Sequence, residues 1–247
     1  MIRFGSLVML TISAQLGAVS FEDYNQALKL HGEALKRWDA GDVLHAERLF
    51  EESVRLDGDV QRNLYTHQYL ARLALNRGDA VTALAYALGI LDVLAVDDPR
   101  NHVPLHIASD AYQLLGDPRQ AEATARRSLA ICFNQRLANR VAWHHATGAP
   151  LRRDLDLALT LAKRVNEETQ FSQGPFMDTL AAVHARRGEF DLAVEMQMKA
   201  VELVPHRCKA DYRSRAELYR LGQPYDEPPP TTAGSLAPLP DGDGVRS

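Results

Sequence analysis

Residues 174–205 read GPFMDTLAAVHARRGEFDLAVEMQMKAVELVP, and this stretch carries the pattern from which the fold is predicted. Before the pair Gly188-Glu189, apolar and small residues recur at helical spacing, and after it they again recur at intervals of three and four. Glycine can end a helix because it adopts the left-handed conformation without a steric penalty. An acidic residue directly after it can cap or favourably charge the next helix. The stretch therefore predicts two helices joined by a tight turn, and Pro205 closes the unit.

The same glycine-acid pair recurs along the chain. It also occurs at Gly41-Asp42, Gly78-Asp79 and Gly116-Asp117, so that the glycines are separated by 37, 38 and 72 residues. Five residues after each glycine stands an alanine: Ala46, Ala83, Ala121 and Ala193. A methyl group is about all that fits where two helices of a hairpin approach closely. Arg153-Asp154, followed by Ala158, marks a further copy without its glycine, so we predict five repeats.

These repeats predict an all-α fold built from helix-turn-helix units. The units lie near residues 27–60, 64–99, 102–133, 135–168 and 174–205, and a capping helix lies at 208–222. Together they form one repeat domain over residues 21–222. The cap is expected because the final repeat would otherwise expose an apolar face. Extra residues between Ala142 and Ala158 predict a lengthened loop inside the fourth hairpin.

The units resemble the tetratricopeptide repeat (TPR), a helix-turn-helix of about 34 residues. The resemblance covers about residues 27–205, and its last part is similar to a variety found in bacterial exported and multi-domain proteins. The fifth unit matches best, at Met177, Leu180, Ala181, Gly188, Phe190, Ala193, Ala200 and Pro205. The resemblance implies an α-α superhelix whose first helices line a concave face. In that family this face binds peptides or segments of partner proteins, and the family as a rule is not enzymatic.

By register, the concave positions of this chain carry aromatic and polar side chains with charges of both signs. Tyrosine, tryptophan and arginine most often anchor binding energy at interfaces. The candidate partner-binding residues are Tyr65, Tyr69, Arg72, His106, Asp110, Asn139, Arg140 and Trp143. Asp178 and Arg186 belong to the same register. Trp143 and Tyr69 are the strongest candidates, and the alternative for each residue is ordinary surface or packing between repeats.

One specific activity of the family is disfavoured by the sequence. Members that grip the acidic C-terminus of cytosolic chaperones use a clamp of lysine and asparagine side chains. The corresponding places in the first three units hold His31, Leu35, Tyr69, Val103 and Ile107. The clamp residues are therefore absent from these units.

Nine histidines raise the question of a metal site. His102 and His106 have the i, i+4 spacing that can chelate, while His144, His145 and His184 come from neighbouring first helices. No cysteine pair, HExxH motif or acidic cluster completes four ligands, so we predict no metal and no cofactor. His145 and His184 occupy places where the family has a packed tyrosine, which favours core histidines. No nucleophile or nucleotide motif appears, so no catalytic residue is predicted and a metal- or ligand-dependent enzyme is the least favoured alternative.

Charge and composition narrow the class of partner. The net charge of −4 argues against a broadly basic nucleic-acid binder. The residues His144, His145, Arg152 and Arg153 form a locally basic loop in the fourth unit. This loop is expected either to carry solvated charge or to face an anionic group on a partner.

The two ends of the chain differ from the repeats. Residues 1–20 combine one positive charge, an uncharged run from Gly5 and the small-x-small end Ala18-Val19-Ser20, which is typical of a secretory signal. The run is too short to span a bilayer as a helix. No other segment is long or apolar enough to cross a membrane, so no stable membrane insertion is expected after removal of the signal. Export to the periplasm or cell envelope is predicted, and the alternative is a cytoplasmic protein whose apolar first helix packs on the domain. Residues 223–247 are rich in proline and glycine and are predicted to be disordered.

The sequence thus favours a non-catalytic scaffold that binds a peptide or a partner-protein segment on its concave face. The alternative is a structural component of an envelope assembly that uses convex or end-to-end surfaces. Neither the partner nor the oligomeric state follows from the sequence, because a fold by itself does not name them.

Overall fold

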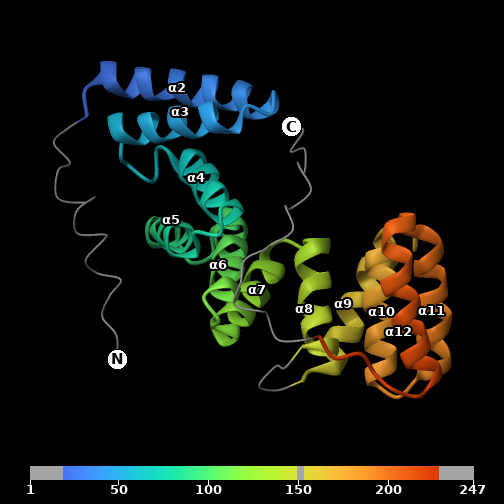
Figure 1. The fold of residues 1–247 in the computed structure, drawn as a ribbon. Coiled ribbons are helices and arrows are strands. Elements are labelled where there is room, and N and C mark those ends of the chain that lie inside the picture. Colours follow the sequence, from blue (N-terminus) through green and yellow to red (C-terminus); the bar gives the residue numbers. More distant parts are fainter. Residues whose placement is uncertain (1–18, 149–152, 228–247) are drawn as a thin grey trace. The chain divides into compact units, whose positions relative to one another are not determined.

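The computed structural model describes residues 19–148 and 153–227. Within these ranges the structure contains eleven α-helices, two short 3-10 helices and no strand. Figure 1 shows the helices in chain order. The all-α prediction is confirmed. Residues 1–18 of the secretory signal predicted at 1–20, and residues 228–247 of the predicted tail, lie outside the described residues. No described helix is both long enough and apolar enough to cross a membrane.

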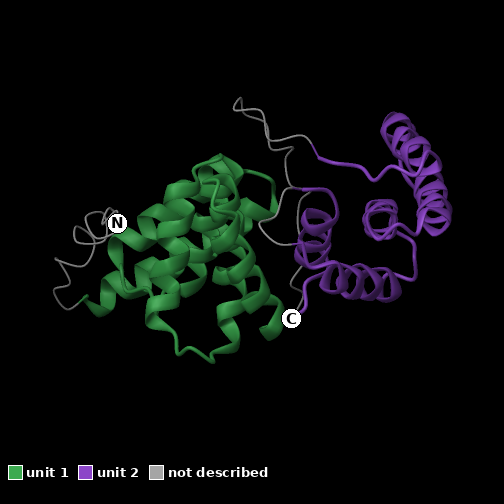
Figure 2. Cartoon of the chain, turned by 90° about the horizontal axis from the view of Figure 1, so that it is seen from below, with its two compact units in different colours: residues 1–131, 235–247 green, residues 132–234 purple. Residues whose placement is uncertain are grey.

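The chain divides into two compact units, coloured separately in Figure 2. Unit 1, described from residue 19 to 131, contains three hairpins, and unit 2, described over 132–148 and 153–227, contains two hairpins and a cap. Consecutive helices pack against one another within each unit. The hairpins of unit 1 are α2 (Phe21–Asp39) with α3 (Val43–Leu56), α4 (Leu64–Asn76) with α5 (Ala80–Val93), and α6 (His102–Leu114) with α7 (Pro118–Ile131). Those of unit 2 are α8 (Gln135–Thr147) with α9 (Leu155–Glu168) and α10 (Gly174–Arg186) with α11 (Phe190–Leu203), followed by the cap α12 (Lys209–Arg220).

The first hairpin begins earlier than its repeat. Helix α2 starts at Phe21, although the repeat pattern becomes recognisable only near residue 27. Its N-cap is Ser20, whose Oγ accepts a hydrogen bond from the backbone N–H of Asp23 at 3.0 Å. Ser20, the last residue of the predicted signal, is thus also the N-cap of the first helix.

Left-handed glycines end the first helix of four hairpins and also end the cap. These glycines have φ between 68° and 82°: Gly41, Gly78, Gly116, Gly188 and Gly222. In each case the next residue donates its N–H to a carbonyl five residues back at 2.9 Å, for example Asp79 to Ala74 and Glu189 to His184. These bonds close the helix end on itself. The predicted role of the recurring glycine is confirmed.

Small residues allow the two helices of a hairpin to approach closely. The five recurring alanines are all buried: Ala46, Ala83, Ala121, Ala158 and Ala193. In unit 1 the Ser53 hydroxyl donates to the Ala27 carbonyl at 2.9 Å, and the Ser128 hydroxyl donates to the His102 carbonyl at 2.8 Å. Both bonds join residues 26 apart, so the same contact recurs in the same register of two hairpins.

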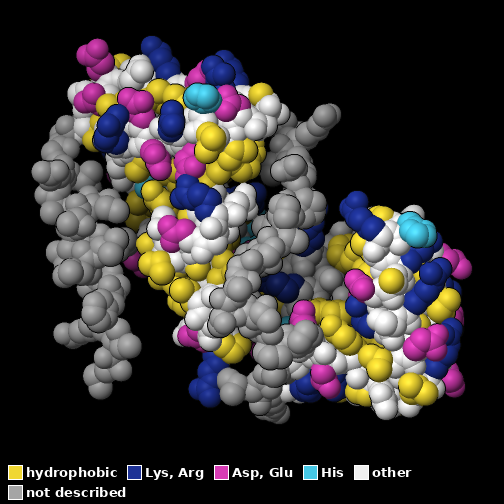
Figure 3. Space-filling view, viewed as in Figure 1, with side chains coloured by type: hydrophobic (Ala, Val, Ile, Leu, Met, Phe, Trp, Pro, Cys, Tyr) yellow, Lys and Arg dark blue, Asp and Glu magenta, His cyan; other side chains and the backbone are white. Residues whose placement is uncertain are grey.

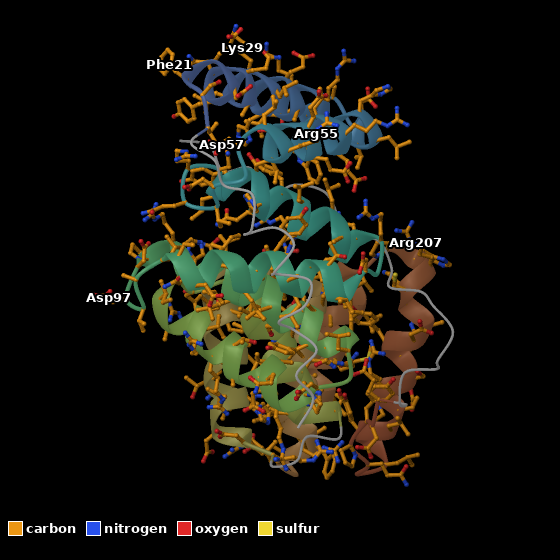
Figure 4. All side chains as sticks on the ribbon, turned by 90° about the vertical axis from the view of Figure 1, so that its left-hand side faces the viewer. Phe21, Lys29, Arg55, Asp57, Asp97 and Arg207 are labelled. Atoms are coloured by element: carbon orange, nitrogen blue, oxygen red, sulfur yellow. The ribbon has the colours of Figure 1, made fainter. Side chains whose placement is uncertain are left out.

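Asp57, labelled in Figure 4, connects the first hairpin of unit 1 to the second. Its side chain is buried and pairs with Arg62, at 2.6 Å between Oδ1 and Nη2. Its backbone carbonyl accepts a hydrogen bond from the Asn63 amide. The hydrogen bonds from Arg62 hold the pKa of the Asp57 carboxyl below its usual range. The connection is therefore fixed by a charge-assisted bond directly before α4.

Helix α8 ends differently from the other first helices. Its C-cap, Gly148, has φ −72° and ψ −170°, so the chain leaves this helix in an extended conformation. The hairpin loop runs from Gly148 to Asp154, whereas three residues join the helices of the other four hairpins, which confirms the predicted lengthening. Arg153 donates instead to the last carbonyls of α8, at 2.8 Å to His145 and 2.6 Å to Gly148. A side chain from just before the second helix thus supplies donors to the end of the first.

Candidate functional site

In unit 1, Tyr69 of α4 lies in an aromatic cluster between the first two hairpins. Its ring stacks on Phe50 at 4.9 Å between centroids and meets the edge of Trp38 at 5.5 Å. Phe50 is fully buried and Tyr69 is half-buried. Offset and edge-on aromatic pairs stabilise a core beyond their buried area. The Tyr69 ring therefore contributes to the packing of unit 1, and its part in binding stays a prediction.

The other candidates of unit 1 lie on α4 and α6. Tyr65 and Arg72 are exposed on α4. On α6, His106 and Asp110 are half-buried, with Nε2 and Oδ2 separated by 3.7 Å. Their role in partner binding also stays a prediction.

In unit 2, helix α8 presents Asn139, Arg140 and Trp143, all half-buried. Burial lowers the pKa of the Arg140 guanidinium to about 10, so it keeps its charge at neutral pH. The Trp143 indole N–H donates to the Glu227 carboxylate at 3.0 Å. The Trp143 ring also lies 5.9 Å from the Tyr225 ring. Trp143, one of the two strongest candidates of the sequence analysis, is therefore in contact with the last described residues of the chain itself.

Residues 225–227 return from α12 to the end of α8, as the red segment after α12 in Figure 1 shows. This segment has no helical structure. The Glu227 backbone N–H donates to the Thr147 carbonyl at 2.9 Å. We call the surface that holds this segment the tail site, and it consists of Trp143, Thr147, Arg153, Arg186 and Arg215.

Arg186, at the end of α10, makes more hydrogen bonds to the tail segment than any other residue of the tail site. Its Nε donates to the Ala146 carbonyl at 2.6 Å. Its Nη2 donates to the Tyr225 carbonyl at 2.7 Å and to the Asp226 carboxylate at 2.5 Å. The Arg186 side chain is 15% exposed, so these bonds lie in a partly desolvated place. One guanidinium thus joins the end of α8 to both the backbone and a side chain of the tail.

The carbonyls at the end of α8 explain why arginines gather there. The C-terminus of a helix carries partial negative charge on its free carbonyls, which attracts cations. Arg153 and Arg186 both bond to these carbonyls, and burial together with the Arg186 charge lowers the pKa of Arg153. The Asp226 carboxylate, 3.6 Å from Arg153, opposes that shift. The acidic tail therefore offsets the repulsion between two neighbouring arginines.

A buried ion pair forms the base of the site. Arg215 of α12 binds Asp178 of α10 with two bonds, at 2.8 and 2.9 Å, and the Gln197 amide donates to the same carboxylate at 2.6 Å. Burial disfavours the charged form of Arg215. The charge of Asp178 and its hydrogen bonds favour the charged form more strongly, so the pKa of Arg215 lies above its ordinary value. The paired guanidinium then faces three rings, 4.6 Å from the centroid of Tyr212, 5.5 Å from Tyr225 and 5.7 Å from Trp143. These are distances at which cation-π attraction acts.

Tyr219 of α12 adds a buried hydroxyl near this base. The side chain is fully buried, and its Oη has no hydrogen-bond partner in the described part of the chain. Burial and the Asp178 charge raise the pKa of Tyr219. A buried hydroxyl without a partner is unusual in a folded protein.

Sequence register located part of the tail site but not all of it. It placed Trp143, Asp178 and Arg186 on the first helices, and the basic loop contained Arg153. It missed Arg215, Thr147 and the tail segment, because residues 223–227 were counted with a proline- and glycine-rich tail. The missing glycine of the fourth unit was the available signal, since a helix end without its turn needs other donors.

The histidines are spread over both units. His145 is fully buried, and His184 is buried with its Nδ1 2.5 Å from the Glu189 carboxylate. The Nδ1 of His102 lies 2.9 Å from the Pro99 carbonyl. In the described ranges no group of three or more metal-ligating side chains comes together. Figure 3 shows acidic and basic side chains intermixed on the face in view.

Comparison with known proteins supports the fold. No protein-family model matches the chain, and no curated protein matches it in sequence. The chain is similar in structure to a thermophilic TPR protein of Thermus thermophilus, with a TM-score of 0.52 and 19% sequence identity. The match covers 79% of this chain and 99% of the other. The helical hairpins described above therefore form a TPR-like fold.

Proposed function

We propose that this protein is a non-catalytic scaffold that binds a segment of a partner protein at the tail site of unit 2. The observation that supports the proposal is the seated segment of residues 225–227. It is held through its backbone, by Thr147 and Arg186, and through its side chains, by Trp143 and Arg186. Bonds to the backbone act on any non-helical peptide, and bonds to the side chains add selectivity. A surface that holds one such segment has the donors and acceptors needed to hold another.

The residue types of the tail site also suit binding. Tryptophan, tyrosine and arginine dominate the energy of most protein interfaces. Trp143 donates a hydrogen bond to Glu227, and Arg186 donates one to Asp226. Arg215 is held in position by its bonds to Asp178. Because the supporting pair holds Arg215 in position before any ligand arrives, less side-chain entropy is lost on binding.

A peptide-library selection tests the proposal. The bait is the full chain with Tyr225→Ala, Asp226→Ala and Glu227→Ala, which removes the side-chain contacts of the tail. We expect this variant to enrich peptides, and we expect the additional change Arg186→Gln to abolish their binding. The matched control Arg187→Gln should leave binding intact, because the Arg187 side chain pairs with Asp156 and Glu189 instead. Peptides that bind equally well without Arg186 would favour the assembly alternative, which uses other surfaces.

Export of the protein is a separate proposal and rests on residues 1–20 alone. Sequencing of the N-terminus of the mature protein tests it. A start at or near Phe21 supports removal of a signal, whereas an intact Met1 in a soluble cytoplasmic fraction contradicts it.

A further inference from the structure

We propose that the tail site recognises an aromatic residue followed by two acidic residues, and that Tyr225-Asp226-Glu227 occupies it as an internal competitor. A partner segment of the same chemistry displaces the tail from its place. This inference rests on the proposed function and adds two things to it, the chemical class of the partner segment and its regulation by the chain's own C-terminal residues.

The first position of the motif is aromatic. The Tyr225 ring is half-buried between the Trp143 ring at 5.9 Å and the Arg215 guanidinium at 5.5 Å. Arg215 cannot turn away, because Asp178 binds it with two bonds. The Tyr225 and Trp143 rings are tilted by 41° to each other, and a flat ring offers its π-face to the guanidinium, which an aliphatic side chain cannot do.

The second position is acidic. Arg186 and Arg153 both bond to carbonyls at the end of α8, so neither guanidinium is free to move apart from the other. The Asp226 carboxylate lies 2.5 Å from Arg186 and 3.6 Å from Arg153. A neutral side chain here would leave two fixed, partly buried cations facing each other without an anion.

The third position combines a carboxylate with a backbone donor. The Glu227 carboxylate accepts the indole N–H of Trp143 at 3.0 Å. The Glu227 backbone N–H donates to the Thr147 carbonyl at 2.9 Å. This second bond fixes the register, because it places the third residue of the motif next to the last turn of α8.

The geometry of the tail makes it suited to displacement. The cap α12 ends at Arg220, and the left-handed Gly222 then turns the chain, so only a short linker precedes Tyr225. A segment on a short linker has an effective concentration of millimolar order, which allows weak contacts to be occupied. The Asp226 side chain is 68% exposed, so its pairing with the arginines is in reach of solvent and of a competing carboxylate. The tail therefore fills the site, and a partner carboxylate can still reach the arginines and displace it.

The probe for the test is a fluorescein-labelled peptide with the sequence of residues 222–228, GQPYDEP, acetylated and amidated. Its binding is measured by fluorescence anisotropy against the full chain and against the full-chain variant with Tyr225→Ala, Asp226→Ala and Glu227→Ala. Releasing the tail should tighten the apparent affinity for the peptide at least about tenfold. A scrambled peptide of the same composition should bind neither protein.

Two further variants connect the affinity to the named contacts. Arg186→Gln in the released background should weaken peptide binding at least about tenfold, because it removes charge-assisted bonds. Arg187→Gln in that background is the matched control and should change little. If the triple variant does not fold, as judged by far-UV circular dichroism, the isosteric pair Asp226→Asn and Glu227→Gln replaces it, with a smaller gain expected.

The outcomes separate this inference from the proposed function. Equal peptide affinity for the wild type and the released variant, or affinity that survives Arg186→Gln, overturns the internal-competitor inference. If the library selection instead yields Arg186-dependent peptides without an aromatic-acidic-acidic pattern, the chemical class is wrong while the proposed function stands. If no peptide binds in a way that depends on Arg186, both the proposed function and the internal-competitor inference are contradicted.

Discussion

Helices α4 and α8 each carry one of the two strongest aromatic candidates of the sequence, but the structure uses them differently. Tyr69 on α4 stacks on Phe50 within the core cluster of unit 1. Trp143 on α8 directs its indole N–H to the Glu227 carboxylate of the tail. The end of each helix accounts for the difference. Gly78 closes the hairpin after α4 in the left-handed conformation, whereas the last carbonyls of α8 accept bonds from Arg153 and Arg186, and Arg186 in turn binds the acidic Asp226.

The tail site therefore lies where the fourth unit departs from the repeat, and not at one of the regular turns. Regular hairpin turns satisfy their own carbonyls and leave no demand for outside donors. Where the loop is lengthened, the partial negative charge of the last helix carbonyls attracts the Arg153 and Arg186 side chains. The carboxylate of Asp226 then offsets the repulsion between these two cations.

The largest expected effect concerns the base of the tail site. Asp178→Ala would leave the Arg215 guanidinium, only 12% exposed, without its partner. Breaking such a buried pair from one side should lower the free energy of unfolding of unit 2 by about 3–5 kcal/mol. Urea unfolding followed by Trp143 fluorescence, in a Trp38→Phe background, measures it. Asp156→Ala, at the 94% exposed partner of Arg187, is the control and should unfold like the parent.

The next effect tests the two aromatic residues against each other. Tyr69→Ala should lower the free energy of unfolding of unit 1 by about 2–3 kcal/mol, because it removes a ring from a packed cluster. Trp143→Ala should cost less stability and instead release the tail. Far-UV circular dichroism in urea reports both variants. Equal losses of stability from the two substitutions would break the distinction drawn between α4 and α8.

A smaller effect is expected at the turns. Gly78→Ala places a Cβ on a residue with φ +78° and should cost about 1 kcal/mol, although no atom lies within 4 Å of that Cβ. Gly32→Ala, in the interior of α2 with open space around it, should stabilise by about 0.5–1 kcal/mol. Thermal unfolding of the two variants compares them directly. A stabilising Gly78→Ala would contradict the account of the left-handed turns.

The smallest expected effect is a pH dependence of unit 1. Burial lowers the pKa of His67 and of His31 below the ordinary value of 6.5. Below pH 6.5 the unfolded chain binds protons that the folded unit resists, so stability should fall as the pH drops from 7 toward 5. Urea unfolding followed by Trp38 fluorescence in a Trp143→Phe background measures this loss. His67→Gln should flatten the profile, and an unchanged profile in that variant would remove His67 as a cause.

The fold could be predicted because its signals are local and repeated. The glycine-acid pair and the alanine five residues later mark each regular turn, and the structure bears them out at Gly41, Gly78, Gly116 and Gly188. The tail site could be predicted only in part. Helical register places Trp143 and Arg186 on first helices, but it cannot bring Glu227 to Trp143 across 84 residues. The repeat pattern marks the irregular end of α8 by its missing glycine, but it does not encode the path of the chain after Gly222, on which the contact also depends.

The indole N–H signals of the two tryptophans show directly whether the tail occupies the tail site through the bond from Trp143 to Glu227. In a ¹H–¹⁵N correlation spectrum of the full chain, Glu227→Ala should shift the Trp143 indole signal and leave that of Trp38 in place, because only Trp143 donates to Glu227. Adding the GQPYDEP peptide to the variant with Tyr225→Ala, Asp226→Ala and Glu227→Ala should move the Trp143 signal back toward its wild-type position. A Trp143 signal that is the same in the wild type and in Glu227→Ala, and that does not respond to the peptide, would contradict the account.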